Sequence, residues 1–181
     1  MTSPARRDPA GRRSAILDAT LTVIAREGIG RTSPRAIARE ADVPLGSTTY
    51  YFPSLRALVE EALELCTTRM VEQLETWSER LHGTDDLAAD LAGLAYDYYI
   101  GDRERALVEY ELYLAAARTP QLRPAARAWT DGLRELLAPT TGRAAAVAIT
   151  ALIDGFLVDA IATGDAVARA DLAAAIEACL R

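Results

Sequence analysis

One sequence feature restricts the possible folds of this chain more than any other. Helix-forming residues fill long segments, and glycine and proline interrupt them at intervals. Alanine, the strongest helix former, supplies 36 of the 181 residues. Apolar residues recur at the three- and four-residue spacing of a helix face, as in Ile16, Ala19, Val23 and Ile24, and no run alternates with a period of two over a useful length. The pattern therefore predicts an all-α protein without a sheet.

Glycine and proline divide the chain into about nine expected helices. These cover residues 11–27, 34–41, 44–50, 55–81, 85–100, 103–118, 121–137, 143–163 and 171–180. The fourth helix, at 1.5 Å per residue, is roughly 40 Å long and is expected to link a three-helix head to a C-terminal helical bundle. Residues 1–9 are expected to form a flexible basic arm.

Charge is distributed unevenly along the chain. Through Arg56 there are nine arginines and five acids, a balance of +4, whereas the remainder has eleven arginines and twenty-one acids, a balance of −10. The two parts sum to the net charge of −6. This asymmetry indicates an N-terminal part that faces a polyanion and an acidic, solvated remainder.

Several classes of protein are not supported by the residues present. Cys66 and Cys179 lie too far apart in sequence to suggest a disulfide framework, and with His82 as the single histidine no metal-ligand spacing is found. There is also no glycine-rich phosphate loop. We therefore expect no cofactor, no metal and no enzymatic activity. The longest apolar run, residues 144–162, contains two aspartates and is interpreted as a buried helix in a cytoplasmic protein without a membrane span.

The segment that carries most functional information is TSPRAIAREADVPLGSTTYYF, residues 32–52. It predicts a short helix, a tight turn at Asp42 and a second short helix, which is the definition of a helix-turn-helix. The second helix of such a unit enters the DNA major groove and presents its N-terminal side chains to base edges. The residues at that end, taken as candidate DNA contacts, are Pro44, Leu45, Gly46, Ser47, Thr49, Tyr50 and Tyr51.

Each of these residue types suits a DNA contact in a different way. Gly46 allows close approach of the backbone, and Ser47 and Thr49 offer hydroxyl groups. Tyr50 and Tyr51 place phenols where phosphates would run, although tyrosines here could instead pack against the helices of the head. The arm could likewise contact DNA or act only as a solubilising tail.

The stretch from about Arg12 to Ala62 resembles the DNA-binding domain of the tetracycline-repressor (TetR) family. The resemblance rests on the opening ILDAT…REG, on IAREA in the second helix, and on the pattern V-x-x-G-S-x-x-Y-x-F-P-S that follows. It implies a DNA-binding domain over residues 10–70, with the helix-turn-helix at about 33–52, and a regulatory and dimerisation domain over residues 71–181.

The resemblance also implies roles for single residues. Thr32 and Arg35 would touch phosphate or a neighbouring base, and Ser47 and Tyr50 stand at customary contact positions. Leu45 and Leu55 replace lysines that many family members carry. Leu45 could touch a thymine methyl group instead. The loss of charge at both positions has two possible consequences: weaker binding at high salt, or compensation by the arm arginines Arg6, Arg7, Arg12 and Arg13.

The C-terminal part offers candidates for an effector pocket. Most aromatic residues of a helical bundle belong to its core, but several here have polar neighbours. Glu111 shares a helix face with Leu107, Leu114 and Arg118, so its carboxylate could pair with Arg118 or act as a polar handle for a ligand. The candidate pocket residues are Tyr96, Tyr99, Tyr110, Glu111, Tyr113, Trp129 and Phe156.

The last two expected helices carry small residues that would allow close packing. In the resembled family these helices form a four-helix dimer interface, whereas the alternative is a core within one chain. The candidate interface residues are Leu152, Gly155, Phe156, Asp159, Leu172, Ile176 and Leu180. The expected function is sequence-specific DNA binding by a homodimeric repressor that a small-molecule effector releases from its operator. The alternative is a helical ligand-binding or enzymatic protein with a vestigial helix-turn-helix.

Overall fold

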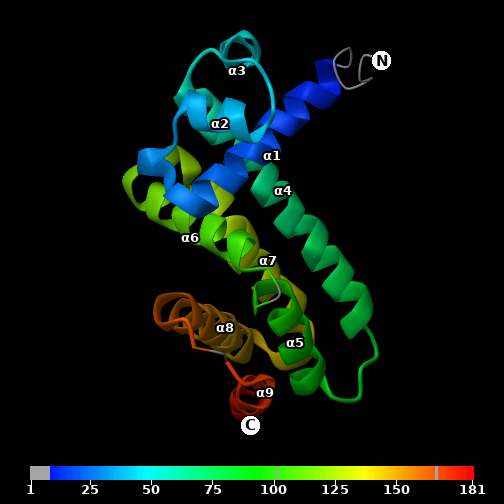
Figure 1. Ribbon diagram of the computed structural model, residues 1–181. Coiled ribbons are helices and arrows are strands. Elements are labelled where there is room, and N and C mark those ends of the chain that lie inside the picture. The colour runs from blue at the N-terminus through cyan, green and yellow to red at the C-terminus, as the bar shows by residue number, and fades with distance from the viewer. Residues whose placement is uncertain (1–8, 101, 166) are drawn as a thin grey trace, which may run out of the picture. The chain divides into compact units, whose positions relative to one another are not determined.

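The computed structural model describes residues 9–100, 102–165 and 167–181, and for Pro9, Tyr99 and Ile100 it describes the backbone alone. Over these residues the chain forms nine α-helices and no strand, as the residue pattern predicts. The helices are α1 (Pro9–Glu27), α2 (Pro34–Glu40), α3 (Leu45–Tyr51), α4 (Leu55–Leu81), α5 (Leu87–Ala95), α6 (Arg103–Arg118), α7 (Arg123–Thr141), α8 (Arg143–Thr163) and α9 (Arg169–Cys179) (Figure 1).

Three short helical turns complete the described part of the chain. Two are 3₁₀ turns, Ile29–Arg31 between α1 and α2 and Pro120–Leu122 before α7. The third is a π-helical turn, Tyr96–Ile100, that directly follows α5. The sequence predicts one continuous helix over 85–100. In the structure the helix begins after its N-cap Asp86, whose side chain accepts a hydrogen bond from the Ala89 amide at 3.0 Å. The α-helix ends at Ala95, and the chain continues as the π-helical turn from Tyr96.

Helix α7 continues beyond the predicted end at residue 137 and includes Pro139 in its last turn. A proline there removes one hydrogen-bond donor, which a helix tolerates near its end better than in its interior. The helix stops instead at Gly142, which has a φ of +81° and donates its amide to the Ala138 carbonyl at 2.9 Å. The left-handed φ, which favours glycine, therefore sets this boundary.

The chain divides into two compact units. The head unit contains residues up to Cys66 together with Leu107–Arg123, and the body unit contains Thr67–Ala106 and Pro124–Arg181. Most of α6 groups with the head in this division, although it follows the domain boundary expected at residues 70/71. Sequence distance gives no signal for such a grouping, since it arises from packing between segments far apart in the chain.

The head unit is built around one apolar cluster in which α1 packs on α2 and α2 on α3 (Figure 1). Its buried members are Ile16, Leu17, Ala19, Val23, Ala36, Ile37, Phe52, Leu58 and Ala62. In the body unit α9 packs against both α5 and α8. The most deeply buried side chains of the body include Trp77, Leu91, Trp129, Leu133 and Ile176.

Candidate nucleic-acid interface

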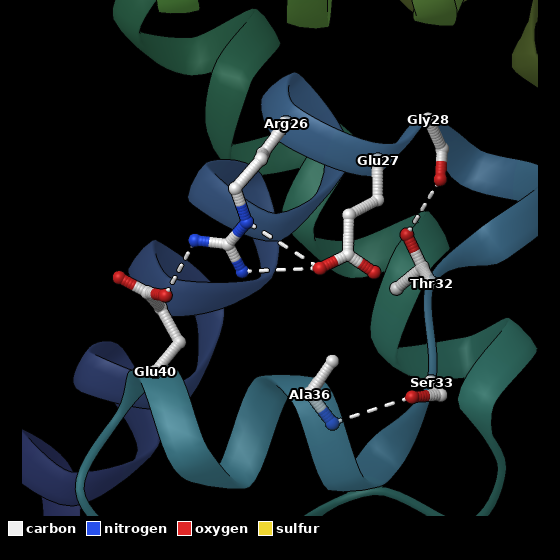
Figure 2. Close-up of polar contacts among 7 residues, drawn as sticks. All are labelled: Arg26, Glu27, Gly28, Thr32, Ser33, Ala36 and Glu40. Carbon is white, nitrogen blue, oxygen red and sulfur yellow. Dashed lines mark hydrogen bonds and ion pairs between the residues drawn. The ribbon is translucent and has the colours of Figure 1, made fainter.

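The junction between α1 and α2 is held by short-range hydrogen bonds. Gly28 ends α1 with a φ of +77°, and its carbonyl accepts from the Thr32 hydroxyl at 2.9 Å. Ser33 then caps α2, its hydroxyl oxygen accepting from the Ala36 amide at 3.3 Å (Figure 2). Serine at this position and Pro34 at the first helical position are the expected start signals of a helix.

An arginine on α1 forms an ion pair with the C-terminal residue of α2. The Arg26 guanidinium donates to the Glu40 carboxylate at 2.8 Å and to the Glu27 carboxylate at 3.2 Å (Figure 2). The hydrogen bond to Glu40, and then that to Glu27, raises the pKa of Arg26, so the guanidinium stays charged. Because all three groups are partly exposed, we assign this contact to alignment of the two helices and only a small stabilisation.

The turn between α2 and α3 lies at Asp42, as predicted. Asp42 has a φ of +50°, a left-handed conformation that aspartate adopts more readily than most residues. The Val43 amide closes the turn by donating to the Ala38 carbonyl at 3.0 Å. Pro44 follows in an extended conformation, and its carbonyl accepts from the Ser47 amide at 2.8 Å to begin α3.

The leading end and outer face of α3 lie in solvent. Tyr50 is 80% exposed and Leu45 is 47% exposed, although both are large and carry apolar surface. Pro44, Gly46 and Thr49 are exposed as well. The leading end and outer face of α3 are therefore accessible to a partner.

The inner face of α3 is fixed to the head. Thr48 is buried, its hydroxyl donating to the Leu45 carbonyl at 2.8 Å, and Phe52 belongs to the apolar cluster. Tyr51 is half-buried against that cluster, with its ring 5.0 Å from the Tyr50 ring in an edge-to-face arrangement. Ser47 is half-buried. Of the two tyrosines, Tyr50 is therefore the one with its ring in solvent.

Thr32 and Arg35 occupy different environments at the start of α2. Thr32 is buried, and its hydroxyl is already donated to Gly28. Arg35 is exposed, as is Arg39 one turn later. We therefore retain Arg35 as a candidate phosphate contact and assign Thr32 to the internal structure of the junction.

One of the N-terminal arginines, Arg13, forms contacts within the head unit. Arg6 and Arg7 lie outside the described residues, as does nearly all of the expected arm over 1–9. Arg13 lies within α1, pairs with Glu61 of α4, and places its guanidinium 5.1 Å from the centre of the Phe52 ring. Arg13 therefore ties α1 to α4, and helix α1 begins at Pro9, before the end of the arm that the sequence suggests.

Trp129, one of the expected pocket residues, is part of a closed aromatic cluster. Its ring stacks on Tyr98 at 5.4 Å and meets Trp77 edge-on at 5.2 Å between ring centres. Arg105 covers Tyr98 with its guanidinium 4.4 Å from the ring centre. All three rings are buried, so they fill the interior of the body unit.

The other expected pocket residues are distributed over both units. Tyr96 and Phe156 line a cavity of about 20 Å³, which is no larger than a water molecule requires. Tyr110, Glu111 and Tyr113 belong to the head unit, and the side chain of Tyr99 lies outside the described residues. The Glu111 carboxylate accepts from the Ile29 amide at 3.0 Å, a partner that the sequence does not suggest.

A hollow that the sequence does not suggest runs between α4 and α7 in the body unit and has a volume of about 510 Å³. Apolar side chains form part of its wall, among them Val71, Leu74 and Leu136. Glu75 and Glu135 add carboxylates, and Asp131, which also lines the hollow, is paired with Arg134 at 3.2 Å. The combination suits a ligand with an apolar surface and positive charge.

The expected interface residues divide into buried and accessible groups. Leu172 and Ile176 of α9 are buried within their own chain, so their side chains are core residues. Leu152 and Phe156 are half-buried, whereas Gly155, Asp159 and Leu180 are exposed. The helical period correctly marks an apolar face on α9, but it cannot tell a face that packs on α5 from one left for a partner.

The head unit thus has the parts of a helix-turn-helix DNA-binding protein: a capped first helix, a tight turn and an exposed second helix fixed by its inner face. Comparisons with known proteins agree with this class. The description "Bacterial regulatory proteins, tetR family" matches residues 16–62, and "Tetracyclin repressor-like, C-terminal domain" matches residues 82–181. The chain belongs to the TetR family of transcriptional regulators.

Individual relatives extend the comparison over the whole chain. A TetR-family member from Streptomyces coelicolor A3 is 36% identical, with a TM-score of 0.82 over 94% of this chain and 98% of that one. The multidrug binding protein EbrR, solved with malachite green, is 35% identical, with a TM-score of 0.78 over 94% of this chain and 98% of its own. EbrR has also been solved with ethidium, at 36% identity and a TM-score of 0.76 over 94% of this chain and 99% of that one.

A curated relative matches a smaller part. The HTH-type transcriptional repressor KstR of Mycolicibacterium smegmatis is 33% identical over 99 residues. The match covers 53% of this chain and 43% of KstR, so it spans less than half of that relative.

Proposed function

We propose that the protein binds operator DNA as a homodimer and represses transcription, with the tip of α3 in the major groove. The observation that carries the proposal is the exposure of that tip: Leu45 and Tyr50 lie in solvent while Thr48 and Phe52 anchor the opposite face. A recognition helix needs both properties, because it must be rigid on its domain and accessible to base edges. Gly46 leaves the backbone open, with no atom within 4 Å of the place a Cβ would take.

The contacts that we assign have two roles. Arg35, with the exposed Arg39, would hold phosphates and set the register, while Leu45, Gly46, Ser47 and Thr49 would meet base edges. Leu45 offers an apolar contact of the kind that recognises a thymine methyl. Tyr50, with its hydroxyl in solvent, would reach a phosphate or a base from the same helix.

Dimerisation would use the outer face of α8. Val147 is 42% exposed and Val158 is 47% exposed, with Ala151 exposed between them on the same face. Helix α8 is long and apolar enough to cross a membrane by length and composition, and 28% of its most apolar window is buried. We propose that a second copy covers this face, since Asp154 and Asp159 on the same helix make a lipid environment costly.

A two-fold dimer would present two α3 helices to a palindromic operator. Half-sites would then lie one helical turn of DNA, about 34–36 Å, or a multiple of it apart. The site of action would be the cytoplasm, where such DNA is found, and the protein would work by binding, without catalysing a reaction.

An aromatic cation is the effector class that we propose. EbrR is known with ethidium and malachite green, which are flat or propeller-shaped aromatic cations. The hollow between α4 and α7 offers carboxylates beside apolar side chains, which suits the same chemistry. The dimer would exist in two geometries, only one of which matches the spacing of the half-sites. The effector would release the protein from DNA if it bound the non-matching geometry more tightly.

Selection from random-sequence DNA tests the DNA-binding proposal. We expect enrichment of a palindrome, and a binding constant that falls steeply with salt in proportion to the phosphates neutralised. In Arg35→Ala, the log–log salt slope should decrease by about one relative to wild type. If no sequence is enriched and binding is insensitive to salt, the head is vestigial and a ligand-binding or enzymatic role becomes the better account.

The effector proposal is tested separately by thermal shift with ethidium. We expect ethidium to raise the melting temperature of wild-type protein and to do so less in Glu75→Gln/Glu135→Gln. Glu79→Gln, an exposed carboxylate of α4 outside the hollow, is the control and should respond like wild type. An equal shift in all three proteins would place the ligand elsewhere.

A further inference from the structure

A side chain of α6 holds the junction between the first two helices of the head. Glu111 Oε2 accepts from the backbone amide of Ile29 at 3.0 Å, although 82 residues separate the two in the sequence. Both residues belong to the head unit and both are half-buried. The contact is a hydrogen bond from a neutral donor to an ionisable acceptor, a class that is stronger than one between two neutral groups.

The local backbone needs this acceptor. Ile29 is the first residue of a 3₁₀ turn, and the first amide of a helical turn has no acceptor within that turn. The preceding residue leaves room for the carboxylate, since Gly28 has no Cβ. A Cβ there would lie 3.2 Å from Glu111 Oε1 and 3.7 Å from its carboxyl carbon. The φ of +77° at Gly28 would in addition strain any other residue.

The anchored amide is connected to the start of α2 by a short chain of hydrogen bonds. The Gly28 carbonyl accepts from the Arg31 amide at 3.3 Å and from the Thr32 hydroxyl at 2.9 Å. Ser33, the next residue, caps α2 (Figure 2). Only three residues therefore lie between the amide held by Glu111 and the N-cap of the first helix of the helix-turn-helix.

We propose that Glu111 is a positioning residue for DNA binding: by holding the Ile29 amide it fixes the α1–α2 junction, and with it the placement of α2 and α3 that fits the groove. The inference rests on the proposed function. Glu111 would then influence operator affinity from α6, which lies outside the helix-turn-helix. Its side chain would do so without contacting DNA. Without the acceptor, the head would occupy the binding-competent arrangement for a smaller fraction of the time, and the apparent dissociation constant would rise by the inverse of that fraction.

The test measures affinity for the palindrome selected with wild-type protein. We expect Glu111→Ala to weaken binding roughly tenfold, which corresponds to about 1.4 kcal/mol. Glu111→Gln keeps a carbonyl oxygen at the same reach and should remain within about threefold of wild type. Glu104→Ala, which removes an exposed carboxylate from the first turn of the same helix, is the matched control and should bind like wild type.

Two further measurements separate positioning from mere stability. The log–log salt slope of Glu111→Ala should equal that of wild type because no phosphate contact is lost, whereas loss of a contacting arginine lowers it. The Ile29 amide should exchange with solvent faster in Glu111→Ala. If Glu111→Ala does not fold, Glu111→Asp keeps the charge, draws the carboxylate back by one methylene, and should show the same weakening.

The possible results are distinguishable. A folded Glu111→Ala, or a folded Glu111→Asp in its place, that binds the palindrome as tightly as wild type overturns the inference and leaves the proposed function intact. Tight binding by Glu111→Ala with a lowered melting temperature also overturns it, because Glu111 would then serve stability alone. Failure of wild-type protein to select any DNA contradicts the proposed function itself.

Discussion

Tyr50 is the residue whose replacement separates DNA contact from folding most cleanly. Its side chain is 80% exposed, so Tyr50→Ala should leave the melting temperature within experimental error of wild type. We expect affinity for the selected palindrome to fall about tenfold, as for loss of one good contact of roughly 1–2 kcal/mol. Tyr51→Ala is the paired comparison and should lower the melting temperature, because Tyr51 packs against the apolar cluster. Unchanged DNA affinity in Tyr50→Ala would remove Tyr50 from the interface.

Asp154 of α8 gives the body unit a defined pH dependence. Burial raises the pKa of Asp154 from 3.8 to about 6, an effect that the charge of Arg134 partly offsets. The raised pKa means that the folded state prefers the protonated carboxyl. Its contribution to stability is full below pH 4 and is lost as the pH rises through 6.

Asp154→Asn should remove this dependence. We expect the variant to be more stable than wild type at pH 8, by about 1–3 kcal/mol, given 1.36 kcal/mol per unit of pKa difference. At pH 4 the two proteins should be nearly equal in stability. Denaturant unfolding at both pH values measures the difference, and an equal gain at both would contradict the assigned cause.

At the scale of single residues, the sequence predicts what depends on neighbours in the chain. The tight turn at Asp42 follows from local backbone chemistry, and the structure confirms it. The helix expected to open at Pro44 begins one residue later, at Leu45, with Pro44 as its N-cap. The partner of Glu111 could not be predicted in this way. The helical spacing shows which residues of α6 lie on the same face as Glu111. That its carboxylate accepts from the Ile29 amide depends on how the helices of the head pack together.

At the scale of elements, Gly132 of α7 lies close to Leu74 of α4. A Cβ at Gly132 would lie 2.6 Å from Leu74 Cδ1, and Leu74 is buried. Because Leu74 Cδ1 is the end of a flexible side chain that also lines the hollow, it can shift, and Gly132→Ala should cost the body unit less than about 1 kcal/mol.

A double-mutant cycle shows whether that contact is the cause. In a Leu74→Ala background the space is free, so Gly132→Ala should cost little or should stabilise the helix. The free energy of unfolding from denaturant titration is the measurement. Additive effects of the two substitutions would show that the clash is not responsible.

The helices themselves are the most predictable elements, since glycine and proline signals are local. The sequence places α4, α6 and α8 at the residues where the structure has them. It misses the π-helical turn after α5 and the continuation of α7 past Pro139. Both are departures within a helix, where the apolar period of the sequence continues and gives no sign of a change in winding.

At the scale of the whole molecule, the account requires a dimer formed through α8. Val158→Glu should convert the protein to a monomer, because it places a charge on the exposed apolar face. Glu177→Ala, an exposed change on α9, is the control. Sedimentation velocity reports the mass of each, and a wild-type protein that sediments as a monomer would contradict the assignment of α8.

Helix α6 is divided between the two compact units. Its first turn belongs to the body, while Leu107–Arg118 groups with the head. The local pattern of α6 is that of an ordinary amphipathic helix, and nothing in it identifies the unit on which it packs. The expected effector residues of α6 fall in the head for the same reason.

The most direct test of the central claim places a photocrosslinker at the tip of α3. Gly46→Cys accepts a label because no atom lies within 4 Å of the new Cβ, and Cys66 is buried, so Cys179→Ala leaves one reactive site. On the selected DNA we predict crosslinks to bases at two symmetric positions, one in each half-site. Crosslinks spread evenly along the DNA, or none at all in a protein that still binds it, would contradict insertion of α3 into the groove.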